Sequence, residues 1–125
     1  MSKKLAKAVR VDGWDRRLED AVSVIASSGP TDDAQCDVAA VCDAVAAMVG
    51  VVIKPTAKDG KALFECLGLE PVNRFSARRG DVGVVFFEGR HLTGVISSSG
   101  FVVRTSIGAS IFSISDIDQA YKIGA

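Results

Sequence analysis

The chain has 125 residues, a length that suits one domain with a buried core. Hydrophobic residues make up 48% of it and the mean hydropathy is +0.27, values that disfavour a disordered chain. Fifteen Lys and Arg residues balance fifteen Asp and Glu residues, so nothing favours a nucleic-acid groove or an anionic membrane surface as a partner.

Targeting and metal signals are absent from the sequence pattern. The basic start lacks the apolar core of a signal peptide, and the longest apolar stretch, residues 38–53, is too short and too interrupted to insert into a membrane. The three cysteines, Cys36, Cys42 and Cys66, have no metal-ligand spacing, and His91 is the only histidine. We therefore predict reduced thiols in a protein made in a cytoplasm, with no metal site and no cofactor.

The first half of the chain is predicted to be helical. Residues 1–12 are expected to form a flexible basic arm, and residues 13–125 a single domain. Apolar residues recur at helical spacing over 14–26, and the following Gly-Pro pair ends that helix. A second helix, over 34–49, is apolar and alanine-rich around most of its circumference, which indicates a central helix. A third helix is expected over 57–67, after a short extended piece at 51–53.

The second half is predicted to be mostly strands. It begins at the turn 77–81, where Gly80 permits positive φ and Asp81 can bond nearby backbone. A cell-adhesion interpretation of Arg79-Gly80-Asp81 is weaker, because a tripeptide arises easily by chance. The expected segments are strands at 82–87, 91–96, 101–105 and 111–114, a hairpin turn at Gly89-Arg90, a helical turn at 116–120 and a terminal strand at 121–123. Helices before strands indicate the α+β class, with N-terminal helices packed on an antiparallel β-meander.

Two residues are candidates for catalysis. Cys36 lies near the start of the central helix, where the helix dipole favours a nucleophilic thiolate; the simpler interpretation is a small buried hydrophobe. His91 begins the second strand of the meander, where it could face that cysteine as its base; otherwise it is a solvent-exposed hairpin residue. Cys42 and Cys66 are interpreted as core residues.

The order of motifs in the second half resembles the NlpC-type papain-like cysteine peptidases. The matching stretches are 79–87, 91–95 and 100–103, which give a Gly-Asp turn, a strand, a histidine-glycine strand and a glycine turn before a third strand. More closely, the chain resembles a small group of NlpC-like proteins found beside tail-tip genes of long-tailed bacteriophages. That likeness adds residues 14–18, 43–50, 77–82 and 120–123.

The central helix departs from this family. NlpC-type enzymes carry Asp-Cys at its start, whereas this chain has Cys36-Asp37, the same pair reversed. Alignment on residues 43–50 places Asp37 at the position of the nucleophile. A one-residue slip on a helix rotates a side chain by about 100°, so Cys36 is expected to point elsewhere.

The histidine strand departs from the family as well. The family histidine lies two residues before the glycine, which here is Leu92 before Gly94, so His91 comes one residue early. Strand alternation then predicts that His91 points away from the helix unless a bulge corrects it. Arg104 and Thr105 are the nearest candidates for the third, orienting residue, and neither fits well.

The resemblance implies a structural component of a bacteriophage tail tip, built on a degenerate NlpC-like fold and carried in the virion. Its partners would be other tail proteins, with arm 1–12 as one contact, and neither nucleic acid nor a membrane. The alternative is an active cysteine endopeptidase that cleaves peptidoglycan stem peptides, with Cys36 as nucleophile and His91 as base. A third interpretation is an unrelated small bacterial α+β protein with a convergent meander.

Overall fold

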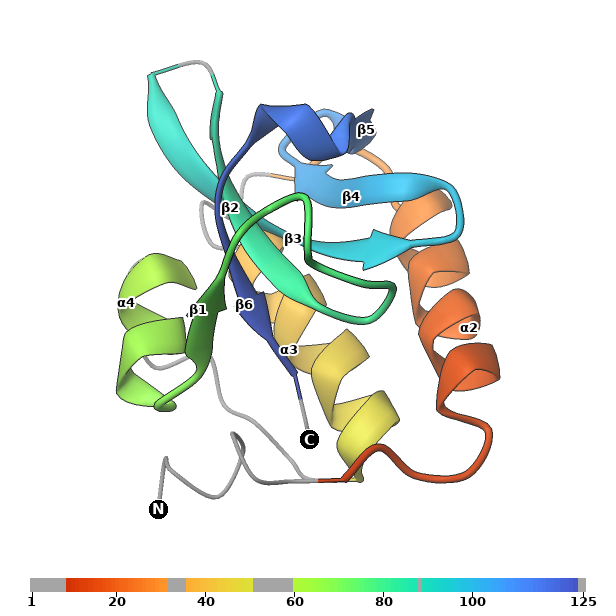
Figure 1. Cartoon of the computed structure of the whole chain (residues 1–125). Coiled ribbons are helices and arrows are strands. Elements are labelled where there is room, and N and C mark those ends of the chain that lie inside the picture. The colour runs from red at the N-terminus through yellow and green to blue at the C-terminus, as the bar shows by residue number, and fades with distance from the viewer. Residues whose placement is uncertain (1–8, 32–35, 51–59, 88, 124–125) are drawn as a thin grey trace.

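Two helices lie side by side against one face of a curved antiparallel sheet (Figure 1). The computed structural model describes residues 9–31, 36–50, 60–87 and 89–123. Its elements are α2 (Trp14–Ala26), α3 (Cys36–Val49), α4 (Gly60–Cys66), β1 (Glu70–Val72), β2 (Val82–Phe87), β3 (Arg90–Ser97), β4 (Gly100–Thr105), β5 (Gly108–Phe112), a 3-10 turn (Ile114–Asp116) and β6 (Ile117–Lys122). The α+β class and the N-terminal helices on an antiparallel sheet are confirmed.

The helices follow the predicted pattern closely. Helix α2 has the predicted bounds and buries Leu18, Val22 and Ile25, which recur at helical spacing. Helix α3 ends at Val49 as predicted, and nine of its fourteen residues are buried, as expected for a central helix. The predicted segments at 34–35, 51–53 and 57–59 lie outside the described residues.

The sheet has six strands in the order β1-β6-β2-β3-β4-β5, so β2 to β5 form the predicted meander. The predicted helical turn at 116–120 is wrong, because these residues belong mainly to β6, which pairs with both β1 and β2. The strand β1 was not expected; it has three residues, includes Pro71 and lies at a sheet edge, the position where a sheet tolerates proline. Arg90 is the first residue of β3, paired with Phe87, and therefore is not part of the hairpin turn.

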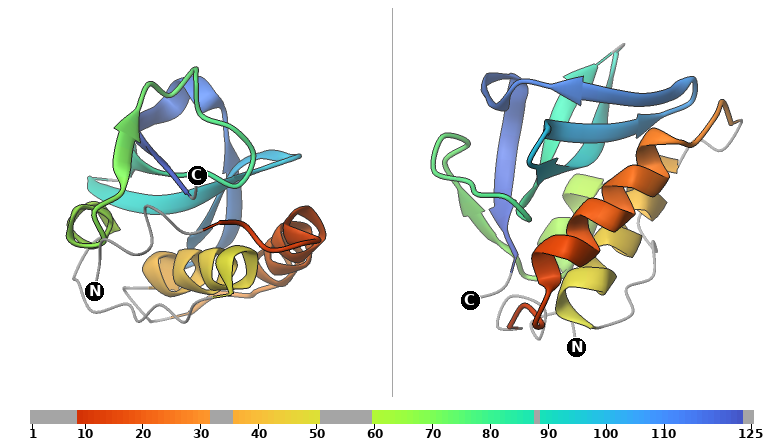
Figure 2. Two further views of the ribbon diagram at one scale, coloured as in Figure 1. Left: turned by 60° about the horizontal axis from the view of Figure 1, so that its bottom comes forward. Right: turned by 90° about the vertical axis from the view of Figure 1, so that its right-hand side faces the viewer.

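The sheet has a hydrophobic core on each face. The larger core lies between the sheet and the helix layer, which Figure 2 shows as one layer beneath the strands. The second core lies on the opposite face, where Phe101 is fully buried. Gly83 and Gly94 pair across β2 and β3 under this ring, and a Cβ on Gly94 would stand 2.8 Å from Phe101 and 2.5 Å from the Val102 carbonyl oxygen. Only glycine lets the backbone approach this closely.

Among the described residues, none of the helices combines the length and the apolar character needed to cross a bilayer. The longest of these helices, α3, has fourteen residues. About twenty residues are required to span the hydrocarbon core.

Candidate functional site

Cys36 is the first residue of α3 and is held against β4. Cys36 is only 6% exposed, and its sulfur lies 3.6 Å from the carbonyl oxygen of Arg104. The thiol is therefore placed to donate a weak hydrogen bond to that oxygen. Cys36 and Arg104 also line a cavity of about 430 Å³ between α2 and α3, and His91 is not among the described residues that line it.

His91 lies on the outer part of β3 and contacts two other strands. Its side chain is 44% exposed, and its Nε2 lies 3.6 Å from Oδ2 of Asp118 on β6. Its ring meets the ring of Phe86, the partner of His91 across β2, in an edge-on contact at 5.1 Å. Cys36 and His91 thus contact different elements, and no hydrogen bond joins them among the described residues.

The faces of β3 differ from the predicted ones. Thr93 contacts helix α3, whereas Leu92 belongs to the core on the opposite face. The prediction that Leu92 occupies the helix-facing position of the family histidine is wrong; Thr93 faces the helix. Since side chains alternate along a strand, His91 lies on the same face as Thr93, and its predicted direction away from the helix is wrong too.

The position predicted for the nucleophile is occupied by a buried carboxylate. Asp37 is 2% exposed, and its Oδ2 accepts hydrogen bonds from the backbone N–H of Thr93 at 2.8 Å and from the Thr93 hydroxyl at 3.0 Å. Strand β3 pairs with β4 only from Val95 to Ser97, so the Thr93 N–H has no strand partner on that side. Asp37 supplies the missing acceptor.

Both residues of this contact, Asp37 and Thr93, are buried. The Thr93 hydroxyl donates a hydrogen bond to the carboxylate of Asp37. Because Thr93 is only 1% exposed, a substrate cannot reach this hydroxyl. The other oxygen of Asp37, Oδ1, accepts no hydrogen bond in the described part of the chain, and the guanidinium of Arg90 stands 3.7 Å from it. Because the Arg90 side chain is 49% exposed, solvent screens this attraction.

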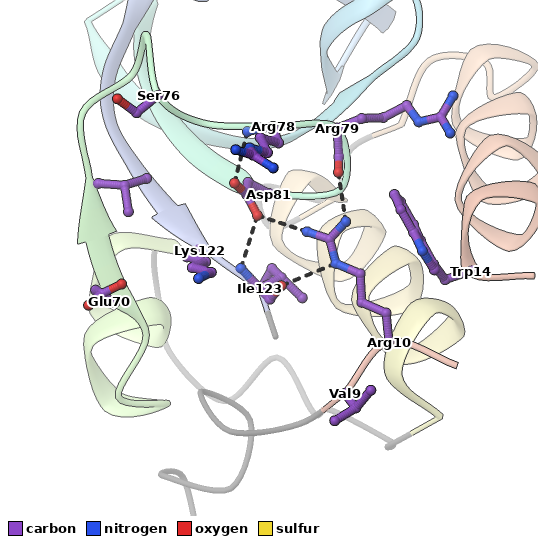
Figure 3. A pocket seen from close by; sticks show the side chains of 11 residues that line it. Val9, Arg10, Trp14, Glu70, Ser76, Arg78, Arg79, Asp81, Lys122 and Ile123 are labelled. Atoms are coloured by element: carbon purple, nitrogen blue, oxygen red, sulfur yellow. Dashed lines mark hydrogen bonds and ion pairs between the residues drawn. The ribbon is translucent and has the colours of Figure 1, made fainter. Parts of the chain in front are cut away.

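Asp81, in the turn before β2, holds three separate segments together (Figure 3). It is 4% exposed; its Oδ1 accepts from Arg10 Nη2 at 2.9 Å and from the Ile123 N–H at 3.1 Å, and its Oδ2 accepts from the Arg78 N–H at 2.9 Å. Arg10 also donates to the carbonyl oxygens of Arg79 at 2.8 Å and Ile123 at 3.1 Å. The turn was predicted; its partner Arg10 was not.

Arg10 is held by an aromatic ring as well as by these hydrogen bonds. Its guanidinium stacks over the ring of Trp14 at 4.3 Å, and a Cβ on Gly80 would stand 2.6 Å from Nη1. Gly80 has φ of +94°, a left-handed conformation that favours glycine at this position. Burial lowers the pKa of the Arg10 guanidinium, the charge of Arg79 lowers it further, and Asp81 opposes both effects.

The predicted arm thus includes bound residues at its C-terminal end. Residues 9–12 are the described part of the arm 1–12. Besides Arg10, the N–H of Val11 donates to the carbonyl oxygen of Met48 at 2.8 Å, which fixes this segment against the end of α3.

A cleft of about 700 Å³ opens beside Asp81. The described residues that line it come from the N-terminal segment, α2, β1, the turn and β6: Val9, Arg10, Trp14, Glu70, Val72, Ser76, Arg78, Arg79, Asp81, Lys122 and Ile123. Among them are four cationic side chains and two carboxylates, a local surplus of positive charge in a chain with no net charge. Within the described ranges, no three His, Cys, Asp or Glu side chains are grouped to share a metal ion.

The class that these residues define is an α+β domain with two helices on a six-stranded antiparallel sheet. No protein-family model matches the chain, and no curated protein matches its sequence.

Proposed function

We propose that this protein is a catalytically inert relative of the NlpC-type papain-like peptidases and serves as a structural component of a bacteriophage tail tip. The observation that carries the proposal is the Asp37–Thr93 contact. Its hydrogen bonds of 2.8 and 3.0 Å occupy the junction of central helix and strand, where a papain-like enzyme needs its thiol and its imidazole.

With Asp37 and Thr93 at this junction in place of a thiol and an imidazole, the groups that a cysteine peptidase needs are missing there. A carboxylate that accepts two hydrogen bonds from one threonine is engaged in holding the strand. A cysteine peptidase needs a thiolate nucleophile and a base within hydrogen-bond reach of it. Cys36 and His91 do not make that contact with each other, since one bonds to β4 and the other meets β2 and β6.

An assembly role suits the free edge of the sheet. Strand β5 is an outer strand with the sequence Gly-Ala-Ser-Ile-Phe, which contains no charge and no proline. Ile111 on this strand is 61% exposed and Ile107 in the preceding turn is 76% exposed. An uncharged edge strand with exposed apolar residues can add a strand from a partner, and in this proposal the partners are other tail proteins.

Digestion of purified peptidoglycan tests the catalytic half of the proposal. We expect no release of peptide fragments by the wild-type protein and none by Cys36→Ser, in parallel with an active cell-wall peptidase as a control. Release by the wild type that Cys36→Ser abolishes would overturn inertness. Mass spectrometry of purified virions tests the structural half, with the protein expected at a fixed copy number and its absence contradicting the assignment.

The alternative function is the active peptidase that cleaves peptidoglycan stem peptides. One observation favours it: Cys36 begins a helix and lines a cavity of about 430 Å³. That cavity would have to admit the substrate without His91, which does not line it among the described residues. The digestion experiment separates the two functions.

A further inference from the structure

The cationic side chains that line the cleft beside Asp81 differ in whether they form ion pairs. Arg10 is paired with Asp81 at 2.9 Å, and Arg79 stands 3.6 Å from Asp15. Arg78 and Lys122 are both exposed, and neither side chain forms an ion pair or hydrogen bond among the described residues. These two cations are thus available to a ligand.

The backbone around both residues is fixed by one carboxylate. Asp81 Oδ2 accepts the N–H of Arg78 itself, and Asp81 Oδ1 accepts the N–H of Ile123, which directly follows Lys122. Lys122 also lies in β6, paired with Glu70 of β1. Cations on fixed backbone lose less conformational entropy on binding than cations on a mobile loop.

The cleft has the size and walls of a small-molecule site. Its volume of about 700 Å³ lies within the range of about 300–1,000 Å³ usual for ligand pockets. The indole of Trp14 and the side chains of Val9 and Val72 add apolar surface, and Ser76 contributes a hydroxyl. Glu70 also lines the cleft and disfavours anions, but positive charge remains in excess.

We propose that this cleft binds a small organic molecule through an oxyanion, a carboxylate or a phosphate group, held by Arg78 and Lys122. The planar guanidinium donates two parallel hydrogen bonds to such a group, and the ammonium adds a point charge. The apolar walls receive the organic part of the ligand. This site does not depend on the proposed tail-tip function and lies apart from the Asp37–Thr93 contact.

Trp14 provides the readout, because it is the only tryptophan in the chain and lines the cleft. The full-length protein is titrated at low ionic strength with inorganic phosphate, with glutarate, and with glutaramide, the uncharged analogue of glutarate. We expect a saturable fluorescence change with an anion and none with glutaramide, and weaker binding as NaCl is added. The stronger of the phosphate and glutarate responses identifies the oxyanion.

Substitutions locate the site. Arg78→Gln and Lys122→Gln should each weaken binding about tenfold, the effect of losing one charge-assisted hydrogen bond. Arg78 bonds to Asp81 only through its backbone N–H, and the exposed Lys122 side chain forms no hydrogen bond or ion pair among the described residues. Both variants should therefore keep the unfolding midpoint of the wild type. Arg16→Gln is the matched control, since Arg16 is an exposed cation of α2 that does not line the cleft.

Two results would overturn the proposal. The first is no fluorescence change with phosphate or glutarate up to about 20 mM together with unmoved amide NMR signals at residues 78–81 and 122. The second is an equal loss of binding in Arg16→Gln and Arg78→Gln, which would indicate a diffuse ion atmosphere.

Discussion

Two buried aspartates hold this protein together in different ways. Both oxygens of Asp81 are hydrogen-bonded, and they join the N-terminal segment, the turn before β2 and the end of β6 beside an open cleft. Asp37 uses one oxygen for Thr93, and its other oxygen has no hydrogen bond within the described part of the chain; both Asp37 and Thr93 are buried. The resemblance to peptidases concerns the second region, whereas the first has an open cleft with two cations, Arg78 and Lys122, that form no ion pair among the described residues.

The two carboxylates also differ in the charge of their partners. Asp81 has a half-buried cation as its partner, and removal of either one leaves an uncompensated charge. Asp37 has neutral donors as its principal partners, and Arg90 stands at 3.7 Å with half of its side chain in solvent. We therefore expect the two carboxylates to differ in their contribution to stability.

The largest effect is expected from Asp81→Ala. The substitution leaves the guanidinium of Arg10 without its counter-charge and the Ile123 and Arg78 N–H groups without an acceptor. We expect a loss of about 3–5 kcal/mol in the free energy of unfolding, measured by urea denaturation. Asp15→Ala is the control, because the exposed Asp15–Arg79 pair should contribute less than about 1 kcal/mol. Equal losses in the two variants would mean that the Arg10–Asp81 pair stabilises the fold no more than the exposed Asp15–Arg79 pair.

A smaller loss is expected from Asp37→Ala. The backbone N–H and the hydroxyl of Thr93 lose their acceptor while they remain buried, which costs about 1–3 kcal/mol. Asp37→Asn keeps an oxygen acceptor and removes the charge, so it should lose less than Asp37→Ala in the same denaturation assay. If Asp37→Asn is as destabilising as Asp37→Ala, the charge rather than the hydrogen-bond acceptor dominates at this junction.

A still smaller loss is expected from Thr93→Val. The variant keeps the backbone N–H that Asp37 accepts and loses only the hydroxyl bond of 3.0 Å, a change of about 1 kcal/mol. A double-mutant cycle with Asp37→Ala should show a coupling energy between the two positions. Strictly additive losses would mean that the hydroxyl contact does not stabilise the fold.

The smallest effect on stability is expected from the ionisation of Cys42, a thiol of the central helix. Burial raises the pKa of Cys42 to about 11, and the neighbouring charge of Asp43 adds to the shift. Relative to the ordinary value of 9.0, this lowers the thiolate fraction about hundredfold at neutral pH. Peptide-resolved iodoacetamide labelling should therefore find Cys42 at least about a hundred times slower in the folded protein than in urea.

The same shift sets the sign of a pH dependence. Between pH 9 and about 11 the unfolded chain releases the Cys42 proton while the folded chain retains it. The stabilisation is present below pH 9 and is lost as the pH rises toward 11. Cys42→Ala should flatten the decline in this range, and an unchanged decline would assign it to other groups.

Much of the fold could be predicted because its signals are local. Helix α2 has an amphipathic pattern that ends before Gly-Pro, and the meander consists of β-branched and aromatic runs. Strand β6 was mistaken for a helical turn because Asp118 is an extra residue, a bulge between the pairs Gln119–Val84 and Ile117–Val85, and it breaks the alternation.

The sites were harder to predict because they depend on distant pairings. The position of Asp37 followed from motif order, but the helix-facing residue of β3 was predicted as Leu92 and is Thr93, and a shift of one residue reverses the face of a strand. The partner of Asp81 lies 71 positions away, and no periodic pattern connects the two. The one sequence signal is Arg10 four residues before Trp14, a spacing that permits stacking.

The bond from Arg10 Nε to the carbonyl oxygen of Ile123, at 3.1 Å, joins residues 113 positions apart, near the two ends of the chain. In the folded state this bond closes a loop that contains residues 10–123. A peptide linker that joined residues 10 and 123 directly would therefore cost little additional closure entropy. The part of the chain from residue 10 to residue 123 is therefore suited to circular permutation, with these two residues joined and new ends opened at an exposed turn.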